Sequence, residues 1–556
     1  MKISDIQNYL KKQHCDAYII TRHNMFIGQD VLPQENKIFE LTGFDGSAGN
    51  LVVFVDHAVL LVDGRYDIIA KNQTNSEEVE VICSRDSIAS WLRANLHEPH
   101  KIFYDAWCHS ASETDYWHKS LDWHKFTEDK DCILGSRIVN SDAEIFELKE
   151  EFAGISSEEK TSYVTDFLKE NNLDAYLFCE CDSVSWLMNL RSDLIKHSPV
   201  LRAYALVNSN GEVSLFTNNF EKLNEELKNY KKQKIGINFS KTPKAIFNYF
   251  KDNNVITRNI NNPIINWKSL KNPVEITGFR NCHIRDGVAL CRFLCWLEKN
   301  FESTDELGCV EKLHQLRAEQ NNFYDDSFAC IAGFGSNGAI IHYHPTSQSN
   351  KKLNKESLLL LDSGGQYFDG TTDVTRTIAF GKQNTKMIED YTFVLKAHIG
   401  LSRQLFPEGV TGAQLDAITR SYLWNYGQDY AHGTGHGVGH FLNVHEGPES
   451  ISLKNQVPLQ KGMVCSIEPG IYNVDNYGIR IENLALVVEK NINQQTFLGF
   501  DTLTLVPYDK KLIDKNLLSK QEIDWINAYH KKIGEILLPL LDQETSEWLK
   551  IQIKEL

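Results

Sequence analysis

The stretch SLLLLDSGGQYFDGTTDVTRT, residues 357–377, joins an apolar run to three aspartates, several hydroxyl side chains and one arginine. The run predicts a buried strand that leads into Asp362. Asp369 and Gly370 are typical of a tight turn, which predicts a hairpin. The hairpin would carry Asp362 and Asp373, eleven residues apart, on neighbouring strands that face one cavity. Because buried carboxylates need a cation or hydrogen-bond donors, we expect a polar site here.

A second cluster, AHGTGHGVGHFLNVHEGP, covers residues 431–448. Glycines alternate with other residues through its first half, which disfavours a helix, and the sequence lacks the HExxH pattern of helical zinc sites. The segment therefore predicts a strand or ribbon that packs closely against its neighbours. Several histidines on such a ribbon favour a site, and they are His432, His436, His440 and His445.

The third cluster, MVCSIEPGIYNVDNYGIRIEN, covers residues 463–483. Glu468 stands before a Pro-Gly pair, and a second turn follows it. Arg480 and Glu482 are two residues apart, so on the returning strand they would share a face. Glu468 and Glu482 would then meet as a second pair of carboxylates.

Together the clusters offer four carboxylates and one imidazole. Four carboxylates cannot stay ionised side by side without multivalent positive charge. A set rich in oxygen, with one nitrogen and no thiolate, suits Mn²⁺, Co²⁺, Fe²⁺ or Zn²⁺, and two ions rather than one. Two ions about 3.5–4 Å apart can share a water and lower its pKa, which is the chemistry of a hydrolase. The candidate metal ligands are Asp362, Asp373, His436, Glu468 and Glu482.

Size and composition exclude several classes of protein. A chain of 556 residues is too long for one core, so we expect two to four domains. The net charge of −16 disfavours a nucleic-acid partner. No apolar run approaches the roughly 20 residues of a membrane span, and the first residues lack the pattern of a signal peptide. Twelve cysteines without a CxxC pair predict reduced thiols, so we expect a cytoplasmic protein with no membrane partner.

A weak internal repeat organises the first half of the chain. Residues 4–21 predict a helix followed by a short strand, and residues 162–179 repeat that order, with Asp-Ala-Tyr in both. The repeat indicates two related α/β domains, joined by a polar segment at 150–160. After a second joint at 262–273, a long helix leads into alternating strands and helices, so the fold class is mixed α/β (α+β). The predicted domains are 1–153, 154–268 and 269–556.

Other enzyme motifs are incomplete or absent in the sequence. GFGSNG at 333–338 matches GxGxxG, but a strand-like segment follows it, where a dinucleotide site needs a helix. We therefore expect a turn beside the site. Neither a GKS/GKT phosphate loop nor the Gly-x-Ser-x-Gly motif of serine hydrolases occurs.

The three clusters together resemble the metal-dependent peptidases of the pita-bread (creatinase/methionine aminopeptidase) fold, and among these the long, three-domain X-Pro aminopeptidase (aminopeptidase P) family. The resemblance extends over essentially the whole chain. GFDGSAG with VDGRY resembles the family's first domain and VSWLMNLR the second, although Ser192 stands where the family often has glycine. IIHYHP joins the catalytic motifs, and FLGFDTLTLVPYD with INAYH resembles the C-terminal part. The implied fold is two creatinase-type N-terminal α/β domains, then a pita-bread catalytic domain with a helical C-terminal portion.

The resemblance also assigns roles to the candidate ligands. Asp362 would chelate one metal ion, and His436 with Glu468 would hold the other. Asp373 and Glu482 would bridge both ions.

Four more residues receive catalytic or substrate-binding roles from the same resemblance. His445 would contact the substrate carbonyl and the tetrahedral intermediate, and His432 would bind substrate. His342, in IIHYHP, would line the pocket for proline. Arg480 would hold the carboxylate ligands in orientation.

The implied reaction releases the N-terminal residue from a peptide whose second residue is proline, by attack of a hydroxide that bridges two metal ions. The family's usual ion is Mn²⁺, with Co²⁺ or Zn²⁺ as alternatives, and its long forms are homodimers. A prolidase, which cleaves Xaa-Pro dipeptides with the same ligands, is the nearest rival, and the duplicated N-terminal domains favour the aminopeptidase. Creatinase shares the fold without the ligands. A non-catalytic, peptide-binding protein of this fold would have lost ligands, and all are present here.

Overall fold

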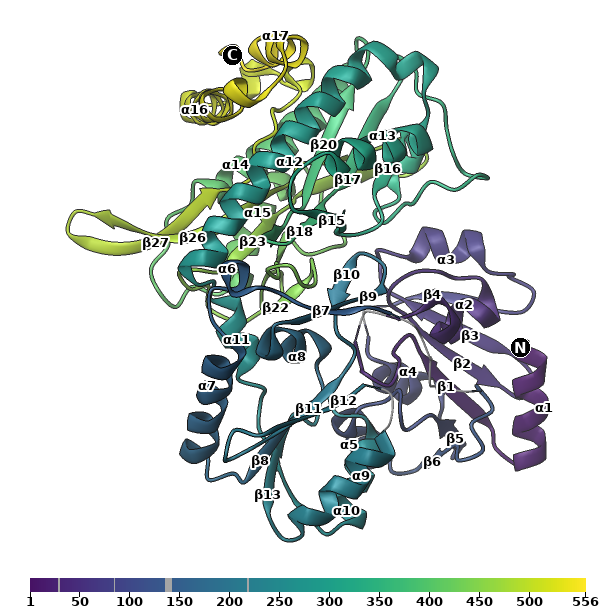
Figure 1. Ribbon diagram of the computed structural model, residues 1–556. Helices are drawn as coiled ribbons and strands as arrows, with labels where there is room; N and C mark the ends of the chain where they lie inside the picture. The colour runs from purple at the N-terminus through teal and green to yellow at the C-terminus, as the bar shows by residue number, and fades with distance from the viewer. Residues whose placement is uncertain (29–30, 85, 136–142, 218–219) are drawn as a thin grey trace. The chain divides into compact units, whose positions relative to one another are not determined.

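The computed structural model describes five stretches of the chain and divides into two compact units, coloured along the sequence in Figure 1. The described residues are 1–28, 31–84, 86–135, 143–217 and 220–556. The first unit comprises Met1–Glu147, Ile155–Ile195 and Val200–Ile264, and the second comprises Leu148–Gly154, Lys196–Pro199 and Ile265–Leu556.

The first unit begins with a six-stranded sheet of order β4-β3-β2-β1-β5-β6. Its central strand β1 (Ala17–Thr21) pairs antiparallel with β2 (Asn50–Phe54) and parallel with β5 (Lys101–Tyr104). Every residue of β1 is buried, as expected for a strand that is covered on both faces. Helix α1 (Ile3–Gln13) leads into this strand. The other elements are α2 (Lys37–Thr42), β3 (Ala58–Val62), α3 (Asp67–Gln73), β4 (Glu80–Cys83), α4 (Ile88–Asn95), α5 (Ala111–Ser120) and β6 (Lys125–Glu128).

A second sheet in the first unit repeats this design, with the order β12-β11-β8-β13-β14. Its central strand β8 (Ala175–Phe178) pairs antiparallel with β11 (Tyr204–Asn208) and parallel with β13 (Lys234–Ile237). Helix α7 (Ser157–Glu170) leads into β8 as α1 leads into β1. The internal repeat predicted from the sequence is therefore confirmed. The other elements are α8 (Cys181–Met188), β12 (Val213–Phe216), α9 (Phe220–Leu227), α10 (Lys244–Asp252) and β14 (Ile256–Asn259).

Short elements connect these parts. The two predicted joints contain helices α6 (Glu150–Ala153) and α11 (Ile264–Ser269). Within the first unit, Arg202, which shortly precedes β11, forms a buried ion pair of 2.6 Å with Glu35. The remaining short strands are β7 (Ile145–Glu147), β9 (Leu190–Ile195) and β10 (Ser198–Val200).

The second unit is built on two antiparallel sheets that carry the sequence clusters. One has the order β16-β17-β20 and the other β22-β21-β23-β26-β27. Figure 1 shows β26 and β27 continuing as a two-stranded arm. The strands are β15 (Phe323–Asp326), β16 (Ile331–Phe334), β17 (Leu358–Ser363), β18 (Gly365–Tyr367), β19 (Gly370–Thr371), β20 (Val374–Ala379), β21 (Gly435–Gly437), β22 (Glu446–Ile451), β23 (Val464–Ile467), β24 (Gly470–Asn473), β25 (Tyr477–Arg480), β26 (Asn483–Ile492) and β27 (Gln495–Thr502).

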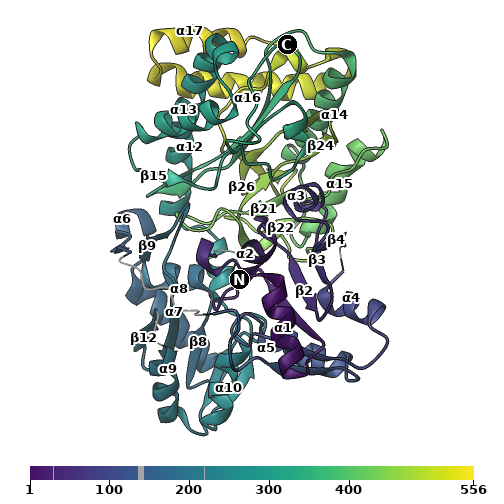
Figure 2. The same ribbon diagram turned by 90° about the vertical axis from the view of Figure 1, so that its right-hand side faces the viewer.

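The helices of the second unit begin where the sequence places their caps. Helix α12 (Pro273–Asn300) starts at a capping box of Asn272 and Glu275, and α15 (Gly412–Trp424) starts at a capping box of Thr411 and Gln414. Figure 2 shows α16 and α17 together at one end of the unit, where both contact α12. The others are α13 (Glu306–Ala318), α14 (Thr385–Ser402), α16 (Lys520–Leu537) and α17 (Gln543–Gln552).

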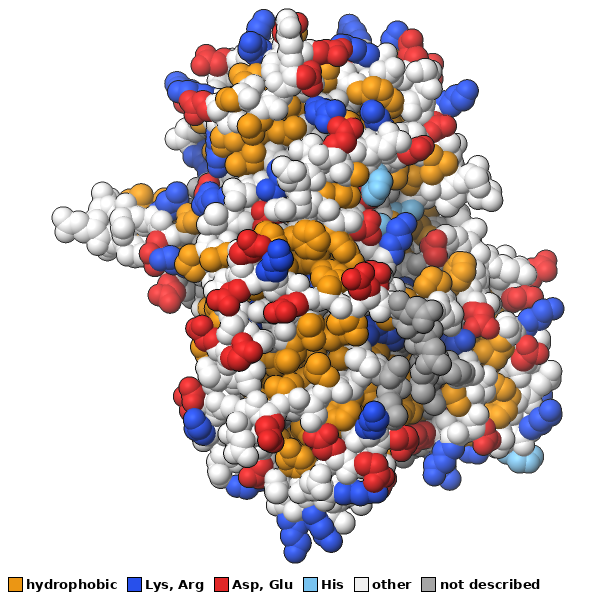
Figure 3. Space-filling model, in the orientation of Figure 1, with side chains coloured by type: hydrophobic (Ala, Val, Ile, Leu, Met, Phe, Trp, Pro, Cys, Tyr) orange, Lys and Arg blue, Asp and Glu red, His pale blue; other side chains and the backbone are white. Residues whose placement is uncertain are grey.

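The surface and the thiols agree with the composition. On the face in Figure 3, acidic and basic side chains are interspersed and do not form one large basic patch. Within the described stretches, no helix combines the length and the apolar character that crossing a membrane requires. All twelve cysteines lie in described residues, and none of them forms a disulfide.

Candidate active site

The hairpin predicted around Asp362 and Asp373 is present. Strand β17 pairs antiparallel with β20, and Asp362 lies opposite Thr375. Asp373 immediately precedes β20, so both aspartates stand at the same end of the strand pair. Asp369 lies in the turn between β18 and β19, as predicted, and its carboxylate accepts a hydrogen bond from Arg285 of α12.

His436 reaches this site from β21. Its Nε2 atom lies 3.4 Å from Oδ2 of Asp373 and 3.6 Å from Oε1 of Glu468. The glycines beside it are needed for packing, because a Cβ on Gly435 would lie 1.9 Å from the Ser466 carbonyl oxygen. The prediction of a closely packed strand instead of a helix is confirmed.

Glu468 and Glu482 lie side by side beyond the end of a strand pair. Strand β23 pairs antiparallel with β26, and the last pair is Ile467 with Asn483. The two glutamates are the next residues on each side. The prediction that Arg480 and Glu482 share one strand was wrong, because β25 ends at Arg480 and Glu482 lies in the bend before β26. The bend still directs both side chains to the site.

Hydroxyl groups hold the two glutamates, and the sequence did not reveal them. Thr375 Oγ1 donates a 2.7 Å hydrogen bond to Oε2 of Glu482, and Ser466 Oγ donates a 3.1 Å bond to Oε1 of Glu468. Thr375 stands two residues after Asp373, hence on the same face of the strand, and this spacing was the available signal.

The carboxylates fit a pair of cations. Ligand atoms of Asp373, His436 and Glu482 lie within 4.8 Å of one another. Burial and the neighbouring carboxylates Asp362 and Glu468 raise the pKa of Asp373 well above its ordinary value. The pKa values of Glu482 and Glu468 are raised as well, first by burial and then by neighbouring carboxylates. Such a set is stable as anions only when positive charge is added.

A second group of possible ligands lies elsewhere in the same unit, and ion pairs account for it. His314 Nδ1 lies 2.8 Å from Oδ2 of Asp326, and His197 Nδ1 lies 3.3 Å from Oδ2 of Asp325. Each carboxylate therefore has an imidazole partner already.

A chain of hydrogen bonds connects His432 to Asp362. His432 Nε2 lies 2.8 Å from the hydroxyl of Tyr472, which accepts a 2.6 Å hydrogen bond from Nη1 of Arg480. Nη2 of Arg480 in turn donates a 2.6 Å bond to Oδ2 of Asp362. Tyr472 lies in the third sequence cluster, at 463–483, but received no role from sequence reasoning.

The two remaining predicted residues, His445 and His342, lie close to residues of the site. The ring of His445 lies edge-on to that of His436, with centroids 4.4 Å apart and planes at 85°. His342 is half-buried and follows Ile341, whose carbonyl oxygen accepts a 3.4 Å hydrogen bond from Arg480. GFGSNG forms the turn predicted beside the site, a 3₁₀ segment at Gly335–Ala339.

A buried arginine outside the predicted set supports the backbone of the site. Arg376, on β20, donates hydrogen bonds of 2.7 Å to the carbonyl oxygen of Glu482 and 2.8 Å to that of Thr375. It stands in the quoted stretch, but its direction away from the ligands was not predictable from its spacing.

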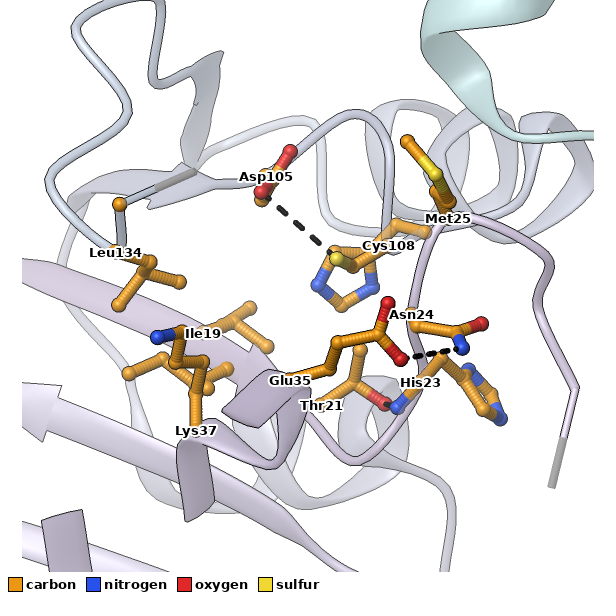
Figure 4. A pocket seen from close by; sticks show the side chains of 13 residues that line it. Ile19, Thr21, His23, Asn24, Met25, Glu35, Lys37, Asp105, Cys108 and Leu134 are labelled. Carbon is orange, nitrogen blue, oxygen red and sulfur yellow. Dashed lines mark hydrogen bonds between the residues drawn. The ribbon is translucent and has the colours of Figure 1, made fainter. Parts of the chain in front are cut away.

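The first unit contains a small cavity of about 40 Å³, drawn in Figure 4. Asp105 accepts a hydrogen bond from the thiol of Cys108, and Asn24 donates one to Glu35. The volume suits a few water molecules. None of the predicted site residues lines this cavity.

Models of known protein families match nearly the whole chain. Metallopeptidase family M24 matches residues 277–489, and the C-terminal region of peptidase M24 matches 496–556. The creatinase/prolidase N-terminal domain matches twice, at 2–139 and 137–275.

Individual relatives share this organisation from end to end. Xaa-Pro aminopeptidase 1 of Dictyostelium discoideum is 37% identical and covers 100% of this chain and 96% of its own length. The crystal structure of X-prolyl aminopeptidase from Caenorhabditis elegans, described as a cytosolic enzyme with a di-nuclear active site, has a TM-score of 0.92 at 31% identity. That match covers 98% of this chain and 95% of the other.

A prolidase is more distant. The Pyrococcus horikoshii prolidase is 25% identical with a TM-score of 0.51, and it covers 63% of this chain and 99% of its own. The geometry of the site, the doubled N-terminal domain and the relatives that match from end to end all indicate the same family. The chain belongs to metallopeptidase family M24, in its group of Xaa-Pro aminopeptidases with two creatinase/prolidase N-terminal domains and a C-terminal region.

Proposed function

We propose that this protein is a metal-dependent Xaa-Pro aminopeptidase, which releases the N-terminal residue from peptides with proline in the second position. The observation that carries the proposal is the meeting of four carboxylates and an imidazole from segments far apart in the chain, with ligand atoms of Asp373, His436 and Glu482 within 4.8 Å of one another. The relatives in Dictyostelium and Caenorhabditis, named for this activity, support it.

The site would hold two divalent ions. Asp362 would help to hold one ion, His436 and Glu468 would help to hold the other, and Asp373 and Glu482 would serve both. Mn²⁺ is our first choice, because an oxygen-rich donor set with a single imidazole suits it, and Co²⁺ or Zn²⁺ is the alternative. When bound, such ions supply Lewis acidity at a carbonyl group and lower the pKa of water.

The protein's own groups orient the ligands and the substrate. Arg480 fixes Asp362 through a 2.6 Å hydrogen bond, and Thr375 fixes Glu482 through one of 2.7 Å. His445, beside His436, donates its imidazole N–H to the substrate's carbonyl oxygen as negative charge develops there.

Two histidines bind parts of the substrate away from the cleaved bond. His432, held by Tyr472 at 2.8 Å, contacts the peptide backbone. His342 lines the pocket for the proline ring. Because the amide nitrogen of an Xaa-Pro bond carries no hydrogen, recognition depends on the shape of that ring.

The setting of the enzyme is also proposed. We place the protein in the cytoplasm, as a homodimer with peptides as its partners, and divide it into domains at 1–153, 154–268 and 269–556. The cytosolic description of the Caenorhabditis enzyme supports the first statement. Sedimentation velocity tests the second, since a single species near the 63.6 kDa of one chain would contradict the dimer.

A peptide series on reconstituted protein tests the function. The purified chain is stripped with a chelator, and each divalent ion is added back in turn. We expect no turnover of an Xaa-Pro-Yaa tripeptide by the stripped protein and recovery with Mn²⁺. A matched Xaa-Ala-Yaa peptide should stay intact. Absence of turnover in protein that holds two ions per chain would refute the enzyme and favour a peptide-binding role.

The preferred length of the substrate distinguishes an Xaa-Pro aminopeptidase from a prolidase. Longer Xaa-Pro peptides should be cleaved at least as well as Xaa-Pro dipeptides. A strong preference for the dipeptide would identify a prolidase instead, which the resemblance to the Pyrococcus enzyme makes the relevant comparison.

A further inference from the structure

Two lysines converge on one glutamate in the interior of the second unit. Nζ of Lys271 donates a 2.7 Å hydrogen bond to Oε1 of Glu446. Nζ of Lys268 lies 2.7 Å from Oε2 of the same carboxylate. The three side chains are at most 1% exposed. Glu449, three residues later in the chain, is buried beside them. Two cations and two acids thus share a space closed to water.

Stability alone does not account for this cluster. Removing charged groups from water costs several kcal/mol per ion, and apolar side chains of the same volume often replace buried ion pairs at no loss. A buried ion pair does, however, fix one arrangement of the chain, because any shift leaves a charge without its partner. The cluster is therefore best explained by what it holds in place.

Glu446 stands next to the proposed site in two ways. It directly follows His445 in the chain, and it is the first residue of β22. It lies opposite Gly437 of β21, the neighbour of His436. The residue that directly follows His445 is therefore the one whose carboxylate the two lysines hold. His445 itself is exposed, and its ring lies edge-on to that of His436.

The lysines belong to a fixed part of the unit. Lys268 is in the last turn of α11, and Nζ of Lys271 also donates a 2.7 Å hydrogen bond to the Lys268 carbonyl oxygen. The backbone N–H of Lys271 donates a 3.0 Å bond to the carbonyl oxygen of Gly462. The next residue, Asn272, caps α12. The anchor thus connects His445 to the start of the longest helix of the unit.

We propose that Lys268 and Lys271 are positioning residues for the hydrolysis: through the Glu446 carboxylate they fix the backbone from which His445 reaches the substrate carbonyl. The inference rests on the proposed function for the role of His445. It goes beyond it in assigning a task to three buried side chains that touch neither the substrate nor the ions.

Lys271→Met tests the anchor, because methionine keeps the apolar stem and removes the charge. We expect kcat for the tripeptide to fall roughly 10- to 100-fold, the range typical of groups that orient a reacting side chain, with KM changed less than about 3-fold. Two ions should still bind per chain. Lys271→Arg should recover most of the loss. Lys268→Met should also lower kcat, and it replaces Lys271→Met as the test variant if Lys271→Met does not fold.

Lys160→Met is the matched control. Lys160 is a lysine of the first unit that is 1% exposed and donates hydrogen bonds to the Trp186 carbonyl oxygen and to Oδ1 of Asn189. Its replacement should lower thermal stability as Lys271→Met does, yet leave kcat unchanged. An equal fall of kcat in both variants would show that lost stability, and not position, lowers the activity.

A double-mutant cycle identifies the residue through which the lysine acts. In a His445→Ala background, Lys271→Met should reduce kcat by less than about 2-fold, since the group it positions is absent. The same factor in both backgrounds would overturn the proposal, because a general loss of folded protein acts independently of His445.

A chemical readout makes the test independent of turnover. Diethyl pyrocarbonate modifies accessible imidazoles, and peptide mapping reports the rate at His445. This rate should change at least about 3-fold in Lys271→Met and stay constant in Lys160→Met. An unchanged rate in Lys271→Met would refute the anchor even if the protein proved inactive on every peptide. Failure of the wild-type chain to cleave peptides would instead refute the proposed function alone.

Discussion

Arg480 donates a 2.6 Å hydrogen bond to Oδ2 of Asp362, while Oδ1 of the same carboxylate is buried without a hydrogen-bond partner among the described residues. Tyr472 accepts a hydrogen bond from the same guanidinium at 2.6 Å, and Thr375 accepts one at 3.2 Å. These bonds fix the orientation of the Arg480 side chain. One oxygen is therefore satisfied, and the other is left for a cation. The ion pair between Arg480 and Asp362 therefore determines that a metal ion would meet Oδ1 of Asp362.

Arg480→Lys should weaken metal binding. Lysine keeps the charge but cannot join Asp362, Tyr472 and Thr375 with one planar group, so the carboxylate loses its orientation. We expect the affinity for one of two Mn²⁺ ions to fall roughly 10- to 100-fold in calorimetry. Arg202→Lys, which alters the buried 2.6 Å ion pair with Glu35, is the control and should leave the affinity unchanged. Equal affinities in all three proteins would contradict the orienting role of Arg480.

Asp373→Asn should abolish two-ion binding. An amide cannot supply a negative oxygen to two cations at once, so elemental analysis of the purified variant should find at most one ion per chain. Asp369→Asn, in the same hairpin, is the matched control and should keep both ions, since its partner is Arg285. Full occupancy in Asp373→Asn would exclude the bridging role.

Thr375→Val removes one hydrogen-bond donor at nearly constant volume. Oε2 of Glu482 loses its 2.7 Å bond and becomes free to turn. We expect kcat/KM for an Xaa-Pro tripeptide to drop roughly 10-fold. Thr419→Val provides the comparison, because the Thr419 hydroxyl, equally buried, donates its hydrogen bond to the Leu415 carbonyl oxygen of its own helix. If both variants lose the same activity, support of Glu482 is not the reason.

Two buried histidines, His283 and His530, should each contribute a loss of stability in mild acid. Burial lowers the pKa of His283 to about 4, and burial with the charges of Lys510 and Arg376 lowers the pKa of His530 to about 3. The unfolded chain protonates these rings near pH 6.5, so the folded state is fully favoured above that value and loses ground as pH falls toward 4. Each ring costs about 1.4 kcal/mol per pH unit within this window.

Thermal unfolding between pH 7.5 and pH 4.5 measures the effect. His530→Gln should flatten the dependence of the melting temperature on pH, because glutamine does not titrate. His57, whose side chain is 55% exposed, is the control, and His57→Gln should reproduce the wild-type curve. A curve for His530→Gln that matches the wild type would show that this ring does not contribute.

Much of the site was predictable because the chemistry is local in the sequence. Asp362 and Asp373 flank a turn that contains Asp369 and Gly370, and any such hairpin brings its arms together. The alternating glycines around His436 excluded a helix, because glycine disfavours helix wherever it occurs. The doubled α/β sheets followed from a repeat in which Asp-Ala-Tyr recurs.

The supporting contacts were not predictable, because they join distant segments. Lys271 and Glu446 are 175 residues apart, and nothing in either segment names its partner. Thr375 is one of several hydroxyl residues in its strand. Only the folded structure shows that Glu482 packs against this one. The break between β25 and β26 was missed because Arg480 and Glu482 fit a continuous strand equally well by pattern.

The spread of the candidate ligands, from Asp362 on β17 to Glu482 before β26, has a consequence for biosynthesis. The last ligand takes its place only when β26 has paired with β23. A chain still leaving the ribosome offers single carboxylates, which bind divalent ions weakly, and acquires a complete site only once the sheet has closed. Ions would thus enter a scaffold already shaped by Arg480, Thr375 and Ser466. Metal binding would therefore be a late step that follows the pairing of these strands.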